Sequence, residues 1–311
     1  PLTVFRLRDE DEIAVLEMGI SDFGEMTRLA KIAKPDTCVI TNIGTCHLEN
    51  LGDRDGVLKA KTEIFQSMQP SGHIVLNGDD DKLKSYTSRD GRTPVYFGLT
   101  SSCPFHVENI ERKGLKGTYA EFVTPTSRFH AHISIPGDHM IYNALAGVAV
   151  GYALGMNNDE IARGIEKLVP IAGRNNLIEA KHYTIIDDCY NANPQSVSAA
   201  LEILAKTECD RKVAVLGDMG ELGDLTAQAH YNMGALAAML GIDFVAAIGE
   251  KAAMIADGAV ESGGEAYHFA TKEEAIRELT GQLGPNTAML VKASHAMHFG
   301  WIVEELCKAY D

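Results

Sequence analysis

The chain has 311 residues, 45% of them hydrophobic and 23% charged, which predicts a globular protein with two domains that each bury a sizeable core. The net charge of -15 argues against a nucleic-acid partner and an anionic membrane surface, although an anionic substrate needs only a locally basic pocket. The 6 cysteines are scattered without a C-x-x-C pair, and no signal peptide is visible, so we expect free thiols in a cytoplasmic protein.

Short apolar runs alternate with helical patterns in the first third of the chain. We expect strands at residues 3–7, 13–16, 38–43, 73–76 and 95–97, and helices at residues 24–33 and 55–68. The sequence begins at Pro1 instead of Met, and a strand is expected almost at once. We therefore expect a processed chain or a fragment of a longer protein.

The pattern changes over residues 105–136, where alternation between turn signals predicts an antiparallel β insert. Residues 140–156 are the most apolar stretch, but they contain Asn143 and are too few to span a membrane. We expect a buried helix within residues 137–155, followed by an amphipathic helix at residues 158–168, and no membrane insertion.

The alternation of strands and helices restarts after residues 171–174, where we expect a hinge between the domains. Expected strands are residues 183–187, 212–216, 244–248, 267–269 and 288–291, with helices between them, for example at 196–206 and 226–240. This order predicts a parallel sheet with helices on both faces. The sequence thus predicts an α/β fold with two domains, residues 1–172 with a mostly parallel sheet and the antiparallel insert, and residues 173–311 with a Rossmann-like arrangement.

The strand at residues 183–187 is followed by an unusually polar segment. Asp187 and Asp188 end the strand, Tyr190 and Asn191 come next, and Asn193 and Pro194 can cap and begin a helix. A strand, a polar loop and a helix in this order are typical of the ligand-binding edge of an open α/β sheet. The alternative is an ordinary strand-to-helix turn, but two further strands end in comparable polar clusters.

Glycine-rich phosphate-binding loops are absent from the sequence. There is no G-x-x-x-x-G-K-S/T motif and no G-x-G-x-x-G motif. Residues 56–62 come near the first pattern, but they lack its second glycine and have a helical pattern.

Glu17, His47 and Lys61 form a candidate cluster in the first domain. Glu17 and His47 follow predicted strands, so they can converge on one edge of the sheet, where a carboxylate and an imidazole suit a divalent metal. Taken singly, each has an ordinary explanation, as a surface carboxylate, a loop histidine and a solvated helix lysine.

Two further polar positions lie in the second half. Arg174 follows a glycine at the hinge, where an arginine can bind a phosphate with two donors or form an interdomain salt bridge. Lys292 and Ser294 follow the last strand, where Ser294 could also cap a helix.

Several motifs together resemble the Mur ligase family, the ATP-dependent amino-acid ligases of peptidoglycan synthesis. They cover nearly the whole chain: E-M-G (17–19), T-N-I-G-T-C-H-L-E (41–49), G-V-L-K-A-K-T-E-I-F (56–65), N-G-D-D-D (77–81), P-G-D-H-M-I-Y-N-A-L-A (136–146), G-R (173–174), D-D-C-Y-N-A-N-P (187–194), L-G-D-M-G-E-L-G (216–223) and K-A-S-H-A-M (292–297).

The resemblance implies a fold, a reaction and cofactors. It identifies residues 1–172 as the central, ATP- and Mg²⁺-binding domain without its P-loop, and residues 173–311 as the C-terminal domain. The implied reaction forms an acyl phosphate from ATP and then joins D-alanyl-D-alanine to UDP-N-acetylmuramoyl-tripeptide in cell-wall synthesis. Without the P-loop we expect the chain alone to be inactive. The alternatives are another ATP-dependent ligase of the Mur or folylpolyglutamate type and a non-catalytic nucleotide-binding fragment.

The resemblance also implies roles for individual residues. They are Mg²⁺ ligands at Glu17 and His47; a carbamylated, catalytic and metal-binding lysine at Lys61; an adenine contact at Asn143; a phosphate contact at Arg174; a ribose contact at Asp188; and cofactor or substrate contacts at Asn191, Lys292 and Ser294. His47 and Arg174 would also take part in catalysis. The chain departs from the family pattern at Met140, where many members have Asn, and at Ala293 and His295, where K-G-S-R is common.

Overall fold

The computed structural model describes residues 2–87, 91–180 and 183–308. The chain falls into two compact units. The first comprises residues 1–109, 120–131 and 142–165, and the second comprises residues 110–119, 132–141 and 166–311. The predicted α/β class is confirmed, with one parallel, one antiparallel and one mixed sheet. The predicted domain boundary at residues 172 and 173 remains a prediction.

The first unit contains a three-stranded parallel sheet in the order β1-β2-β3. The strands are β1 (Thr37–Ile40), β2 (His73–Asn77) and β3 (Val95–Phe97). The α-helices that precede β3 in the described part of the chain are α1 (Glu25–Ala33), α2 (Leu48–Leu51), α3 (Arg54–Thr62) and α4 (Asp81–Lys84). Leu76 of β2 is fully buried, and it belongs to the same core as Ala30 of α1 and Ala60 of α3.

The strands predicted at residues 3–7 and 13–16 are wrong. Residues 4–6 form a 3-10 helix, and residues 11–20 have no regular secondary structure. The side chains of Ile13 and Val15 are 65% and 92% exposed. An apolar run forms a strand only where a neighbouring strand pairs with its backbone, and none of the described strands pairs with this segment.

The helix predicted at residues 55–68 is interrupted. α3 ends at Thr62, and a 3-10 helix covers residues 63–67. The carboxylate of Glu63 accepts hydrogen bonds from the backbone amides of Gly24 and Thr27, at 3.0 and 3.1 Å. Because these partners are far away in the sequence, periodicity could not reveal this contact.

The predicted antiparallel insert is confirmed as a separate three-stranded sheet, in the order β4-β5-β6. Its strands are β4 (His106–Arg112), β5 (Thr118–Val123) and β6 (Arg128–Ile133), and the helices α5 (Asp138–Ala153) and α6 (Asn158–Glu166) follow. No helix in the described part of the chain is long and apolar enough to cross a membrane.

The second unit is built on a six-stranded sheet in the order β11-β10-β9-β12-β8-β7. Its elements are β7 (Asn176–Glu179), β8 (Tyr183–Asp187), α7 (Pro194–Ala205), β9 (Arg211–Gly217), α8 (Thr226–Met239), β10 (Phe244–Ile248), α9 (Ala253–Glu261), β11 (Ala266–Phe269), α10 (Lys272–Gln282), β12 (Thr287–Lys292) and α11 (Gly300–Lys308). All neighbouring pairs are parallel except β7 with β8, and β7 was not predicted.

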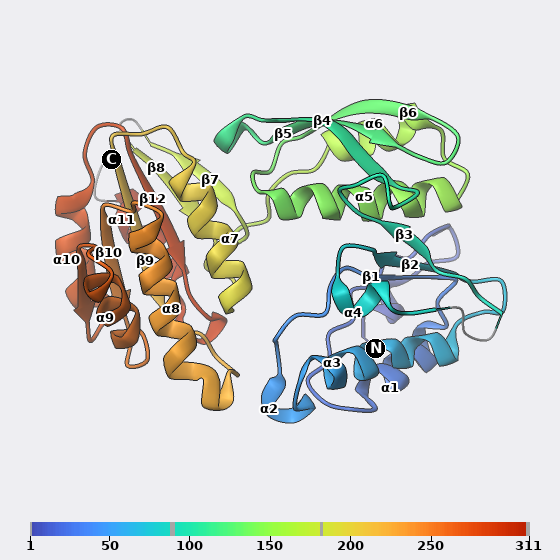
Figure 1. Ribbon diagram of the computed structural model, residues 1–311, viewed down its shortest axis with the longest axis horizontal. Helices are drawn as coiled ribbons and strands as arrows, with labels where there is room; N and C mark the ends of the chain where they lie inside the picture. Colours follow the sequence, from blue (N-terminus) through green and yellow to red (C-terminus); the bar gives the residue numbers. More distant parts are fainter. Residues whose placement is uncertain (1, 88–90, 181–182, 309–311) are drawn as a thin grey trace. The chain divides into compact units, whose positions relative to one another are not determined.

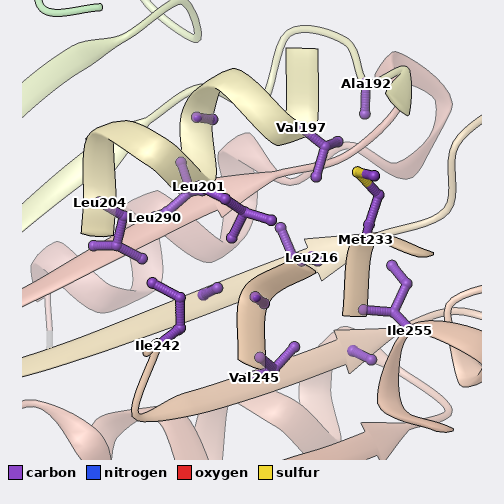
Figure 2. Packing of buried hydrophobic residues seen from close by; sticks show 14 of the residues in the cluster. Ala192, Val197, Leu201, Leu204, Leu216, Met233, Ile242, Val245, Ile255 and Leu290 are labelled. Atoms are coloured by element: carbon purple, nitrogen blue, oxygen red, sulfur yellow. The ribbon is translucent and has the colours of Figure 1, made fainter. Parts of the chain in front are cut away.

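Helices cover both faces of this sheet, as predicted (Figure 1). One core joins α7, α8 and α9 to the sheet, and Figure 2 shows Leu201 and Leu204 of α7 with Leu290 of β12 in this core. The other core contains residues of α10 and α11. Every residue of β10 and of β12 is buried, as expected for parallel strands covered on both faces.

Candidate functional site

The candidate site of the second unit lies at the carboxyl ends of β8, β12 and β9. These strands are neighbours, with Val291 of β12 opposite Asp187 of β8 and Lys292 opposite Leu216 of β9. The connection from β8 to β9 runs through α7 on one face, whereas the connection from β11 to β12 runs through α10 on the other. Open α/β sheets bind ligands outside such a change of direction.

Asp188 and Lys292 form a buried ion pair at this edge. Lys292 Nζ lies 2.6 Å from Asp188 Oδ2, and their side chains are only 2% and 13% exposed. The ammonium also donates to the backbone oxygens of Asn191, at 2.9 Å, and Asp188, at 3.4 Å. Lys292 therefore holds the loop after β8 in place, and its charge is already fully used by acceptors of the protein.

Residues 173–175 are tied to the end of β8 and the loop after it by three hydrogen bonds that backbone amides donate. Gly173 N donates to Asp187 Oδ2 at 2.9 Å, Tyr190 N donates to Gly173 O at 2.9 Å, and Asn175 N donates to Asp188 Oδ1 at 3.1 Å. The Arg174 guanidinium lies over the Tyr190 ring, 4.1 Å from its centroid. The structure thus brings Lys292, from the last strand, to the segment that contains Arg174, Asp188 and Asn191.

Ser294 connects the loop after β12 to the loop after β9. Its Oγ accepts a hydrogen bond from Gly220 N at 2.8 Å, and its amide donates to Asp218 O at 3.0 Å. Ser294 makes no side-chain cap to the short helix that follows, so the alternative of helix capping is wrong.

His230 of α8 bonds to the backbone of the loop after β9. Its Nε2 accepts from Met219 N at 2.9 Å, so the hydrogen is on Nδ1, which donates to Thr226 O at 2.7 Å. The imidazole is fully buried, and burial lowers the pKa of His230. A neutral histidine with both nitrogens paired therefore fixes the backbone of the L-G-D-M-G-E-L-G motif.

Lys61 in the first unit, like Lys292 in the second, bonds to a backbone oxygen in a loop that follows a strand. Its Nζ donates to Asn42 O, just after β1, at 2.9 Å, and burial lowers the pKa of Lys61. Asp80, just after β2, accepts from Ile43 N at 2.8 Å and so joins the loops that follow the two strands. His47 ends the same loop after β1, is half-buried and has a left-handed backbone with φ of 59°.

The other two predicted residues of the first unit are exposed. Glu17 lies in the segment without regular secondary structure, so it does not follow a strand as predicted, and Asn143 lies on α5. Within the described residues, no group of three or more His, Cys, Asp or Glu side chains is placed to hold a metal ion. A ligand set that includes Lys61 remains a prediction.

Sequence reasoning missed several residues that shape the site. Tyr190 and Asp187 were noticed only as parts of a polar run, and Asn175, His139 and His230 were not selected. Asn175 Nδ2 lies 3.1 Å from His139 Nε2. Spacing in the sequence does not predict these contacts, because they depend on how distant segments are arranged in the fold.

The fold and the site together define an α/β protein with a polar cluster at the carboxyl ends of parallel strands. Residues 1–151 match the family of the Mur ligase middle domain, and residues 173–295 match that of the Mur ligase, glutamate ligase domain. The chain belongs to the Mur ligase family.

Curated relatives and solved structures agree with this assignment. The chain is 33% identical to UDP-N-acetylmuramoyl-tripeptide–D-alanyl-D-alanine ligase of Bacillus subtilis over 99% of this chain and 67% of that protein. It is 32% identical to the Escherichia coli ligase of the same name, over 98% of this chain and 68% of that protein. MurF from Acinetobacter baumannii superposes with a TM-score of 0.88 and 31% identity, over 99% of this chain and 67% of that one. MurF ligase from Thermotoga maritima in complex with ADP superposes with a TM-score of 0.82 and 26% identity, over 93% of this chain and 66% of that one. The chain therefore spans about two thirds of the length of these proteins.

Proposed function

We propose that this chain supplies the nucleotide and dipeptide sites of an ATP-dependent ligase that joins D-alanyl-D-alanine to UDP-N-acetylmuramoyl-tripeptide in peptidoglycan synthesis. The observation that carries the proposal is similarity over 99% of the chain to a ligase with this name. The cluster at the carboxyl ends of β8, β12 and β9 supports it, because open α/β sheets bind ligands outside the carboxyl ends of their strands.

ATP is the proposed energy source, in keeping with the ADP bound in the Thermotoga maritima neighbour. In this proposal an oxygen of the tripeptide carboxylate attacks the γ-phosphorus of ATP, giving an acyl phosphate and ADP, and the amine of the dipeptide then displaces phosphate. Asn143 contacts adenine, Asp188 the ribose, and Arg174 a phosphate group. Asp188 can serve in this way beside Lys292, because a carboxylate has about four acceptor positions.

The substrate residues divide into two kinds. Asn191 is exposed, and Ser294 uses its oxygen as an acceptor, so both keep donor groups for a ligand. Lys292 is buried, and we propose that it acts by holding Asp188 and the backbone of Asn191.

Mg²⁺ is the proposed metal, held by Glu17, His47 and a carbamylated Lys61. Two of these side chains meet at one loop, because Lys61 Nζ on α3 bonds to Asn42 O in the loop after β1 and His47 ends that loop. A carbamate would replace a repelling ammonium with the oxygen ligands that Mg²⁺ prefers. When bound, the metal neutralises charge on the phosphates. We place this activity in the cytoplasm, where thiols such as the free cysteines of this chain stay reduced.

The test is phosphate release by the protein that carries this sequence, with ATP, Mg²⁺, UDP-N-acetylmuramoyl-tripeptide and D-alanyl-D-alanine. We expect release to require both substrates, and no product when glutamate replaces the dipeptide. Ligation of glutamate to a folate would favour the folylpolyglutamate alternative. ATP binding without turnover under every condition would favour a nucleotide-binding protein. Since the 311 residues lack a G-x-x-x-x-G-K-S/T motif, we expect this chain alone to bind nucleotide without turnover.

A further inference from the structure

The Arg174 guanidinium is held by an aromatic ring. Within the described residues this guanidinium has no hydrogen-bond or ion-pair partner, and its contact is the face of Tyr190 at 4.1 Å. A free arginine side chain has many rotamers, and ordering it costs free energy. The ring contact reduces that freedom without using any of the five N–H donors.

Tyr190 is well placed to keep this geometry. Its amide is bonded to Gly173 O, one residue before Arg174, at 2.9 Å. A Cβ built on Gly173, whose φ is 77°, would lie 3.3 Å from Tyr190 N, so the two backbones approach closely. The bases of both side chains are therefore fixed to each other, and the stack needs only the two side chains to order.

The ring of Tyr190 also contacts the loop after β12. Its centroid lies 5.4 Å from that of His295, the residue after Ser294. Tyr190 is 48% exposed, which is a high exposure for a large ring between two loops of a site. Core packing does not account for its position.

We propose that Tyr190 is a positioning residue that holds the Arg174 guanidinium with its donors free for a phosphate group. The role of the phosphate rests on the proposed function, whereas the stacking does not. Arg174 meets charge that develops during transfer, so loss of its orientation should lower kcat more than it raises KM for ATP.

The functional test compares Tyr190→Leu with Tyr190→Phe and Tyr190→Trp in the protein that carries this sequence. We expect Leu to lower kcat about two- to five-fold, the size of an exposed cation–π contact, and Phe and Trp to retain most of it because they keep an aromatic face. In an Arg174→Ala background, Tyr190→Leu should have little further effect. Tyr267→Leu is a matched control, since this ring is 56% exposed on β11 at the far edge of the sheet.

A spectroscopic test on the chain itself does not depend on activity. The Nε–Hε signal of Arg174 should carry a ring-current shift and restricted motion, and both should be lost in Tyr190→Leu and kept in Tyr190→Phe. Persistence of both in Tyr190→Leu overturns the proposal, as does an equal kcat loss with and without Arg174. If the protein forms no ligation product while the Arg174 signal behaves as expected, the proposed function fails and the stacking stands.

Discussion

The buried pair of Lys292 and Asp188 allows a sharp test of the site's structure. Lys292→Met removes the ammonium and keeps most of the side chain's apolar length. Three acceptors then lose their donor, namely Asp188 Oδ2, Asp188 O and Asn191 O. The Asp188 carboxylate is left as an unpaired charge with a side chain only 13% exposed.

Removing one partner of a buried pair costs about 3–5 kcal/mol, because the remaining charge has lost its compensation. Since Asp188 keeps some solvent contact and the hydrogen bond from Asn175 N, we expect about 3 kcal/mol, at the lower end of that range. Adding Asp188→Asn should restore part of this loss, since the uncompensated charge disappears.

Urea unfolding followed by Trp301 fluorescence measures this change directly. The chain has one tryptophan, and it packs partly against a core of the second unit, so the signal reports on the unit that contains the pair. Lys206→Met is the matched control, because Lys206 and Glu202 form a surface pair with both side chains at least half exposed. Wild-type stability for Lys292→Met, or strict additivity with Asp188→Asn, would refute the reasoning.

Three further predictions concern titration, the metal site and turnover. Burial lowers the folded-state pKa of His230, so its contribution to stability should be complete above about pH 6.5 and decline as the pH falls below that value. The free energy of urea unfolding, measured between about pH 8 and 5, should therefore depend less on pH in His230→Gln than in the wild type. An identical pH dependence would contradict this. Lys61→Ala should abolish ligation, and short-chain carboxylates should partly rescue it. Lys59→Ala is the control, because Lys59 is exposed on the same helix, and it should ligate normally. Ligation by Lys61→Ala at the wild-type rate would disprove the carbamate. Arg174→Ala should lower kcat more than ATP affinity, as measured by phosphate release and calorimetry, and a pure affinity loss would count against a role in transfer.

Local sequence was a good guide wherever the deciding interactions are short-range. Asn193 caps α7 and Pro194 occupies its first turn, as predicted, and the structure adds a reciprocal capping box between Asn193 and Ser196. The strands of the second unit were located because buried parallel strands read as continuous apolar runs. The same regularity predicts Asp187, Asp188 and Lys292 at strand ends.

Tertiary structure decided what those side chains do. A lysine after a strand can face solvent, a substrate or a carboxylate, and only the adjacency of β12 and β8 pairs Lys292 with Asp188. Ser294 could have capped a helix, but the neighbouring β9 loop presents Gly220 N to it. Residues 13–16 have the composition of a strand without forming one, because strand formation needs a partner. Composition and periodicity therefore determined which segments are strands and helices in most of this chain, whereas hydrogen-bond partners between distant segments were set by the order of the strands in the sheet.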